Sequence, residues 1–255
     1  MPYMKVHIDP QYEQLRGEIM KVVAGDYVAS KVYCHKRNVV EKVCMQGKEY
    51  VVKTYKRPNL FNRLAYTYLR KTKAKRAFLN ALHLLELDIE TPTPVAYIEI
   101  YRKGLFSKGY FISEYVPYHT IRETFDGKTP ESNDHNLKAE FMKFTLALHE
   151  KKVLPLDFNS GNIFYYFDTE KECYRFALTD INRMQFGKTP STYAVMRSFE
   201  QLGVPVDGLY KLALYYSSQK GSDLEYSMFI FLFHRLRSRI KRFLKKKAKR
   251  QRQLS

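Results

Sequence analysis

The amino-acid sequence predicts an α+β fold of two lobes, a strand-rich first lobe and a helix-rich second lobe. Three observations support this. Residues 20–57 are β-branched and aromatic runs separated by turn residues, which is typical of an antiparallel meander. Residues 60–87 and 136–151 have the apolar spacing of amphipathic helices. After residue 187 the sequence pattern is helical almost to the end.

The first lobe is expected to span residues 1–116. Its strands are predicted at 20–24, 27–33, 38–44, 49–55, 95–101 and 109–116. One helix is predicted at 60–87, and the Thr-Pro-Thr-Pro sequence at 91–94 ends it. Its apolar face is formed by Ala74, Ala77, Phe78, Ala81, Leu82, Leu84 and Leu85.

The second lobe is expected to span residues 117–236, followed by a basic tail at 237–255. The helix at 136–151 presents Leu137, Phe141, Phe144 and Leu148 on one face. Short strands and loops are predicted from there to about Gly187. Further helices are predicted at 191–202, at 208–219, and from about Leu224 into the tail.

The charge of the chain is concentrated in its tail. The formal net charge is +18, and no acidic residue follows Glu225. The segment from Arg235 to Arg252 alone has 11 Lys or Arg. An apolar stripe runs through the same helix: Phe229, Leu232, Phe233, Leu236, Ile240 and Phe243. A basic amphipathic helix of this kind suits an anionic membrane surface.

Two other interpretations of the tail stay open. A basic arm can bind nucleic acid, although we favour the membrane. Phe229–Leu236 can also belong to the core of the lobe, which leaves only the last dozen residues as a solvated tail. We expect the first part to be core and the remainder to seek a membrane.

Cysteine usage and the N-terminus favour a cytoplasmic protein. Cys34, Cys44 and Cys173 are few, odd in number and far apart, which does not suit a disulfide framework or a zinc site. The first ten residues lack the apolar stretch of a secretion signal. No run reaches the ~18 apolar residues that span a bilayer.

Four polar residues form a pattern that suits phosphoryl transfer. Asp157 and Asn162 are five residues apart, Asp180 ends an apolar run, and Lys53 lies on a predicted strand. Asn162 and Asp180 have the oxygen ligands that Mg²⁺ prefers. Lys53 would bind phosphates, and Asp157 would accept the proton of an attacking hydroxyl.

Each of these residues also has an ordinary structural interpretation. Lys53 alone is most simply a solvated lysine on a strand. Asp157 and Asn159 can be turn formers, and Asp180 can cap a helix. His149, at the end of its helix, suits compensation of the helix dipole better than catalysis. The preserved order of the four residues favours the kinase interpretation.

These motifs resemble those of protein kinases. Asp157-x-x-x-x-Asn162 is similar to the catalytic loop, Leu178-Thr-Asp180 to the metal-binding strand end, and Val51-Val-Lys53 to the lysine strand. Glu114 and Tyr115 resemble the hinge that reads adenine through backbone groups.

A closer resemblance is to the lipopolysaccharide kinase family of Kdo and heptose kinases, the WaaP type. It covers roughly residues 25–235 and depends on the joint order of five segments. These are residues 50–57 (YVVKTYKR), 72–81 (TKAKRAFLNA), 89–96 (IETPTPVA), 157–163 (DFNSGNI) and 179–184 (TDINRM).

Four departures from the kinase pattern accompany this resemblance. No glycine-rich loop is visible, and the helix acid that pairs with the strand lysine falls at Ala77, with Asn80 one turn further. The His-Arg before the catalytic Asp is replaced by Pro155-Leu156. Asp180 is followed by Ile-Asn instead of Phe-Gly. We therefore expect neither an activation-loop phosphate switch nor a mobile activation segment.

The resemblance implies an enzyme that uses ATP and Mg²⁺ to phosphorylate a Kdo or heptose hydroxyl of a lipid-A-linked core oligosaccharide. It would act on the inner face of a bacterial inner membrane, with the tail on the anionic surface. The alternatives are a kinase-fold scaffold without turnover, an RNA-associated kinase, or a protein kinase. The sequence leaves the acceptor hydroxyl and the oligomeric state open.

Overall fold

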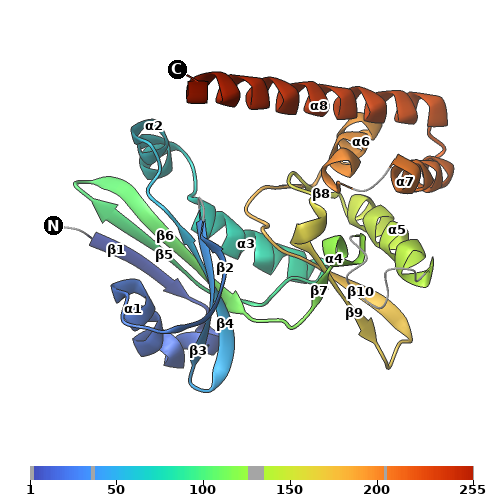
Figure 1. Cartoon of the computed structure of the whole chain (residues 1–255). Helices are drawn as coiled ribbons and strands as arrows, with labels where there is room; N and C mark the ends of the chain where they lie inside the picture. Colours follow the sequence, from blue (N-terminus) through green and yellow to red (C-terminus); the bar gives the residue numbers. More distant parts are fainter. Residues whose placement is uncertain (1–2, 36–37, 126–134, 204–205, 255) are drawn as a thin grey trace. The chain divides into compact units, whose positions relative to one another are not determined.

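A computed structural model describes residues 3–35, 38–125, 135–203 and 206–254. The chain divides into two compact units (Figure 1). Unit 1 comprises Met1–Tyr118 together with Ala177–Arg183, and unit 2 comprises His119–Phe176 together with Met184–Ser255. Unit 1 contains the large sheet and unit 2 most of the helices, so the predicted α+β class is confirmed.

Unit 1 is built on a six-stranded sheet in the order β1-β5-β6-β4-β3-β2, with antiparallel neighbours. Its strands are β1 (Tyr3–Ile8), β2 (Ala29–His35), β3 (Asn38–Met45), β4 (Lys48–Tyr55), β5 (Pro94–Arg102) and β6 (Leu105–Glu114). The sequence did not predict β1, which pairs with β5 at an edge of the sheet, Tyr3 opposite Tyr101. A six-residue edge strand is stabilised mainly by its partner, so its own sequence carries a weak signal.

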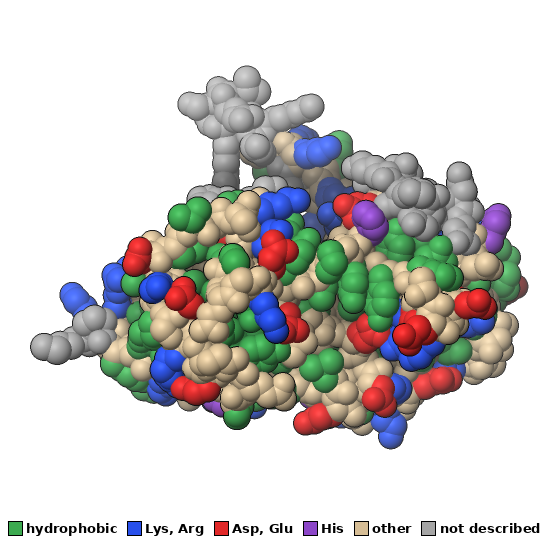
Figure 2. Space-filling view, turned by 90° about the horizontal axis from the view of Figure 1, so that it is seen from below, with side chains coloured by type: hydrophobic (Ala, Val, Ile, Leu, Met, Phe, Trp, Pro, Cys, Tyr) green, Lys and Arg blue, Asp and Glu red, His purple; other side chains and the backbone are tan. Residues whose placement is uncertain are grey.

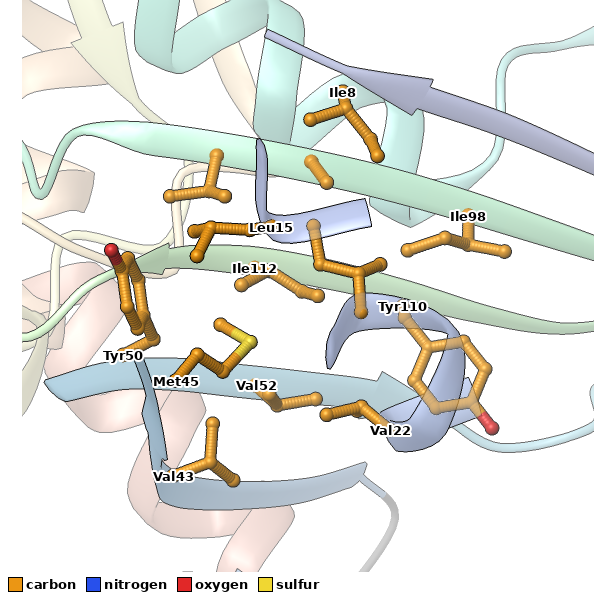
Figure 3. Close-up of a cluster of buried hydrophobic side chains, with 13 residues drawn as sticks. Ile8, Leu15, Val22, Val43, Met45, Tyr50, Val52, Ile98, Tyr110 and Ile112 are labelled. Atoms are coloured by element: carbon orange, nitrogen blue, oxygen red, sulfur yellow. The ribbon is translucent and has the colours of Figure 1, made fainter. Parts of the chain in front are cut away.

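One face of this sheet is covered by η1 (Pro10–Leu15) and α1 (Arg16–Ala24). Leu15, Ile19 and Val22 are buried against side chains such as Val52 and Ile112 (Figure 3). The strand predicted at 20–24 is therefore wrong. Apolar residues three to four apart form a helical face here, and Gly25, with φ 86°, ends the helix in the left-handed conformation.

The opposite face of the sheet is covered by α3 (Lys73–Glu86). The Phe78 ring of α3 contacts His7 of β1 and Tyr97 of β5, with ring centroids 5.0 and 5.3 Å away. A Cβ built on Gly109 would come within 3.3 Å of the Ala74 Cβ, so helix and strand approach closely at this glycine. Ala74, Ala77, Phe78, Ala81 and Leu84 are buried as predicted, whereas Leu85 is exposed.

The single helix predicted at 60–87 is interrupted. The structure has α2 (Leu60–Leu64), the π-helical turn η2 (Ala65–Leu69), and then α3. Thr72 lies at the break, where its hydroxyl caps α3 by accepting from the Lys75 amide and donates to Glu99 at 2.6 Å. Because Thr72 is buried and bonded in an extended conformation, the helix cannot pass through it.

Unit 2 contains short strands and the remaining helices. The strands are β7 (His119–Thr120), β8 (Val153–Pro155), β9 (Ile163–Asp168), β10 (Cys173–Leu178) and β11 (Met184–Phe186), arranged as β10-β9-β7 and β11-β8. The helices are α4 (Ile121–Phe125), α5 (His135–Glu150), η4 (Ser160–Asn162), α6 (Thr192–Gln201), α7 (Val206–Lys220) and α8 (Leu224–Leu254). Among the described helices, none is both long and apolar enough to cross a bilayer.

His149 of α5 is buried among aromatic rings. Its ring lies 5.4 Å from that of Tyr216 and 6.4 Å from that of Phe199. Burial, with a contribution from Lys220, lowers the pKa of His149 to about 4. The imidazole is therefore neutral at pH 7, and compensation of the helix dipole, the role expected from its position, does not apply.

The depressed pKa of His149 predicts acid sensitivity. The unfolded chain takes up the proton near pH 6.5 and the folded chain only near pH 4, so the free energy of unfolding falls as the pH drops through this window. The loss should reach about 3 kcal/mol. In urea unfolding, the free energy of unfolding of His149→Leu should fall less between pH 7 and pH 4.5 than that of the wild type does. His135→Leu, at an exposed site of the same helix, is the control and should keep the full loss.

Candidate active site

Lys53 lies in the middle of β4, opposite Val40 of β3 and Phe111 of β6. Its neighbour Val52 points into the core beneath α1, so strand alternation turns Lys53 toward the opposite face of the sheet. There the Lys53 Nζ lies 2.5 Å from the Asp180 Oδ1. The Lys53 side chain is only 14% exposed, so solvent screens this ion pair less than it would screen a surface pair. Residues 127 positions apart thus meet within unit 1.

Asp180 is held in an unusual backbone conformation. Its φ is +51°, the left-handed region that non-glycine residues enter rarely. The Asn182 side-chain amide donates to the same carboxylate oxygen at 2.6 Å and supports this geometry. Uncommon conformations of this kind persist where the surroundings fix them, and they concentrate at functional sites.

The segment that carries Asp180 is anchored to the rest of unit 1 at three points. The Asn80 side chain of α3 donates to the Ile181 carbonyl at 2.7 Å. The Thr91 hydroxyl donates to the Leu178 carbonyl, and the Leu178 amide donates to the Glu90 carbonyl, both at 2.8 Å. These bonds fix the position of the carboxylate relative to β4.

The helix residue that aligns with the kinase acid, Ala77, is buried and apolar. Asp180 therefore takes the place of that acid as partner of Lys53, and Asn80 fixes the Asp180 segment instead of the lysine. The sequence did not predict the bond from Asn80 to Ile181. A side chain that bonds a backbone carbonyl 101 residues away leaves no local signal.

Two further polar groups of unit 1 lie near this pair. The Tyr55 hydroxyl and the Arg76 Nε are buried, and neither has a hydrogen-bond partner among the described residues. Burial raises the pKa of Tyr55, and the nearby Asp180 carboxylate raises it further, while Arg76 acts in the opposite direction. Sequence analysis did not single out either residue.

The hinge residues predicted to read adenine lie at the end of β6. The Glu114 amide donates to the Thr93 carbonyl at 2.9 Å, and the Tyr115 amide donates to the Glu49 carbonyl at 3.1 Å. Both N–H groups are therefore engaged within the protein. Adenine recognition at these two residues would have to use their carbonyl oxygens, and it stays a prediction.

The catalytic-loop motif lies in unit 2, between β8 and β9. The Asn162 side-chain amide donates to the Asp157 carbonyl at 3.1 Å, and the amide of Asn162 donates to the Asn159 carbonyl at 2.7 Å. Between them Phe158 is buried and stacks on Phe141 of α5. The loop is thus folded back on itself, with Asp157 half-buried at its start.

Arg122 of α4 lies over this loop. Its guanidinium donates to the Asn159 side-chain oxygen, which also accepts from the Gly161 amide at 2.9 Å. A Cβ built on Gly161 would lie 2.9 Å from the Arg122 Cζ, so a larger residue here would require the guanidinium to shift. The turn interpretation of Asn159 is therefore correct. Arg122 was missed because it is distant in sequence from the motif.

The structure thus brings the four predicted residues into two pairs, Lys53 with Asp180 in unit 1 and Asp157 with Asn162 in unit 2. That both pairs act on one nucleotide remains a prediction. No group of three or more His, Cys, Asp or Glu side chains suited to a metal occurs among the described residues. Mg²⁺ keeps several waters and takes phosphate oxygens, so a single protein carboxylate such as that of Asp180 is compatible with binding it.

Comparison with known proteins identifies the fold. No family profile and no curated protein matches the sequence. A solved structure described as WaaP in complex with acyl carrier protein matches 92% of this chain and 98% of its own chain, with a TM-score of 0.59 and 14% identity. The chain has a protein-kinase-like fold. At this identity the likeness shows the fold alone, and the predicted membership of the lipopolysaccharide kinase family is supported only at that level.

Proposed function

We propose that this protein is an ATP-dependent kinase that phosphorylates a Kdo or heptose hydroxyl of the lipopolysaccharide inner core. The observation that carries the proposal is the contact between the Lys53 Nζ and the Asp180 Oδ1 in a protein-kinase-like fold. Two charged groups are thereby held together in a partly buried position, and the backbone of Asp180 is strained. A purely structural ion pair needs neither the strain nor the three anchoring bonds.

In this proposal the residues of unit 1 bind the nucleotide. The Lys53 ammonium would contact the α- and β-phosphates, as the strand lysine of a kinase does. Lys53 and Asn182 both contact Oδ1 of Asp180, so the second oxygen, Oδ2, is the atom available to ligate a cation. Bound Mg²⁺ would neutralise the phosphate charge that develops during transfer. Asn162 would complete the cation site.

Asp157 would orient the acceptor. Its carboxylate would accept the hydrogen bond of the attacking sugar hydroxyl and take its proton as the new O–P bond forms, while the bond from the γ-phosphorus to the bridging oxygen breaks and ADP leaves. Because Asn159, Arg122 and Gly161 hold the loop through the Asn159 side chain, Asp157 is carried by a fixed turn. Rigid placement of this kind is what a positioned base requires.

The direct test is an assay of the purified full chain with Mg²⁺ and ATP on lipid-A-linked Kdo and heptose acceptors. Mass spectrometry should show one added phosphate on the sugar. Comparison of core oligosaccharides from cells with and without the gene should show the same difference. A chain that binds Mg²⁺-ATP but phosphorylates neither acceptor would favour the scaffold alternative or a protein acceptor.

The exposed residues of helix α8 support a location of the protein at a lipid surface. Ser227, Ile230, Phe231 and His234 are buried on its first turns, which pack against α6 and α7. The apolar stripe predicted for this helix faces away from α6 and α7. Its exposed residues are Phe229, Leu232, Phe233, Leu236, Ile240 and Phe243. The expectation that Phe229–Leu236 belong to the core is therefore wrong for the four stripe residues in that range, and Ile230 and Phe231 between them are buried. The face in Figure 2 intersperses acidic and basic side chains, whereas α8 has no acid after Glu225.

We accordingly propose that α8 lies on the anionic inner leaflet and keeps the enzyme near a lipid-linked acceptor. Each Lys or Arg close to such a surface contributes about 1 kcal/mol, which salt screens. The exposed apolar stripe adds a component that salt does not remove. This arrangement raises the local concentration of a lipid substrate.

Deletion of residues 237–255 tests this role of α8. The described side chains of this segment are not buried, so folding should change little. Activity on a lipid-bound acceptor should fall much more than activity on a soluble sugar fragment. At low salt, the truncated protein should bind anionic vesicles more weakly than the full chain does. Circular dichroism controls for folding. Equal loss on both acceptors would assign the segment to the catalytic lobe, and full vesicle binding without it would contradict the proposal.

A further inference from the structure

In the segment Leu60–Leu69 an arginine side chain is buried while several large apolar side chains are exposed. In α2 the buried side chain is Arg63, which is 8% exposed, while Phe61 is 78% exposed. In η2, Tyr68 is 72% and Leu69 is 83% exposed. A folded chain that places an arginine inside and a phenylalanine and a leucine outside opposes the hydrophobic effect in water. The exposed face, Leu60, Phe61, Leu64, Tyr68 and Leu69, is named here the α2 patch.

Specific hydrogen bonds hold Arg63 inside and so fix this arrangement. The Arg63 Nε donates to the Phe106 carbonyl at 2.9 Å, and its Nη2 donates to the Arg102 carbonyl at 3.3 Å. The Thr67 hydroxyl donates to the Arg63 carbonyl at 2.7 Å and accepts from the Phe106 amide at 2.9 Å. Tyr66 packs edge-on against the Phe106 ring. The β5–β6 hairpin therefore fixes which residues face outward, and Figure 1 shows helix α2 beside this hairpin.

The ends of the segment are fixed as well. The Asn59 side chain caps α2 by accepting from the Asn62 amide at 3.0 Å. The Arg70 guanidinium donates to the Asn62 side chain at 2.6 Å and lies 4.5 Å from the Tyr66 ring centroid. The α2 patch is thus presented by an ordered element, so its exposure is not that of a loose loop.

The charged residues that flank the α2 patch in the sequence are all positive. Arg57 on one side and Arg70 and Lys71 on the other are exposed. No acidic residue occurs between Glu49 and Glu86, a stretch with eight Lys or Arg among residues 56–76. Exposed aromatic and aliphatic side chains bracketed by cations match a bilayer interface, where the rings enter the headgroup region and the cations meet anionic lipids.

We propose that the α2 patch is a membrane-docking site that inserts into an anionic phospholipid surface. The patch is separate in sequence from α8 and does not depend on the kinase reaction. Its apolar side chains supply a hydrophobic contribution that survives high salt, whereas the tail of α8 supplies mainly charge.

The absence of tryptophan from the chain allows a direct test. Phe61→Trp places a single indole in the α2 patch of the otherwise unchanged full chain. With vesicles of phosphatidylglycerol and phosphatidylcholine, its emission should shift to the blue and be quenched by lipids brominated on their acyl chains. The matched control is Phe167→Trp on β9, which is also exposed but lies beside Asp168, Glu170 and Glu172, and it should show neither effect.

A second measurement separates the contribution of apolar insertion to vesicle binding from that of electrostatic attraction. The double variant Phe61→Ser/Leu69→Ser should lose roughly tenfold in vesicle partitioning, and the loss should persist in high salt. Both side chains are exposed, so the fold should be retained. Unchanged Phe61→Trp emission while the protein sediments with vesicles would overturn the proposal. So would a blue shift that depends on protein concentration without lipid, because it would assign the patch to self-association.

Discussion

Replacing Asp157 by asparagine is expected to lower kcat by roughly a thousandfold while Mg²⁺-ATP binding stays nearly intact. A general base contributes about 10² to 10⁴ to the rate, and a thousandfold loss is the middle of this range. Asparagine keeps the shape of the side chain but cannot accept the proton. Because Asp157 lies in unit 2, apart in the chain from Lys53 and Asp180, its loss should not disturb their ion pair.

The measurement is steady-state kinetics on the lipid-linked acceptor together with calorimetric titration of Mg²⁺-ATP. Glu170→Gln is the control, since this exposed residue lies in the turn after β9, within the same unit. It should keep near-normal turnover. Near-normal turnover of Asp157→Asn would show that the base is assigned to the wrong residue.

Replacing Asp180 by asparagine is expected to weaken Mg²⁺-ATP binding and transfer together. Asparagine tolerates the positive φ of this position better than alanine does, so the backbone should be kept while the charge is lost. Changing groups that only support a metal ligand costs about 10- to 100-fold in affinity, and removal of the ligand charge itself should cost at least as much. Lys53 would also lose its ionic partner.

Titration of ATP with and without Mg²⁺ separates these effects. The Mg²⁺-dependent part of the affinity should disappear in Asp180→Asn, whereas ATP alone should bind almost as before. Asp26→Asn, an exposed site of the same unit, is the control and should leave both affinities unchanged. Undiminished Mg²⁺-ATP affinity in Asp180→Asn would mean that this carboxylate does not ligate the cation.

The amphipathic helices were predicted well because their signal is local. Apolar residues three to four apart define α3 and α5 within single segments, and their burial follows from that spacing. The contact between Lys53 and Asp180 joins two of the four residues that the sequence pattern singled out, and phosphoryl transfer by Lys53, Asp157, Asn162 and Asp180 stays a prediction.

Local patterns failed where a partner element decides the conformation. Residues 20–24 have the composition of a strand but form the end of α1, because Ile19 and Val22 pack on the sheet only from a helix. The helix predicted at 60–87 breaks at Thr72, because its hydroxyl reaches Glu99 on β5. In each case tertiary contacts outweigh an intrinsic preference worth less than about 1 kcal/mol per residue.

Local sequence patterns sufficed to predict the α+β class, the helices with strong periodicity and the basic tail. Only the tertiary structure decided that Asp180, and not a residue of α3, pairs with Lys53, and that Asn80 anchors the Asp180 segment. It also decided that Arg63 faces inward while Phe61 and Leu69 face outward. The physical reason is that these features depend on bonds between residues 39 to 127 positions apart, and such bonds leave no periodic trace in the chain.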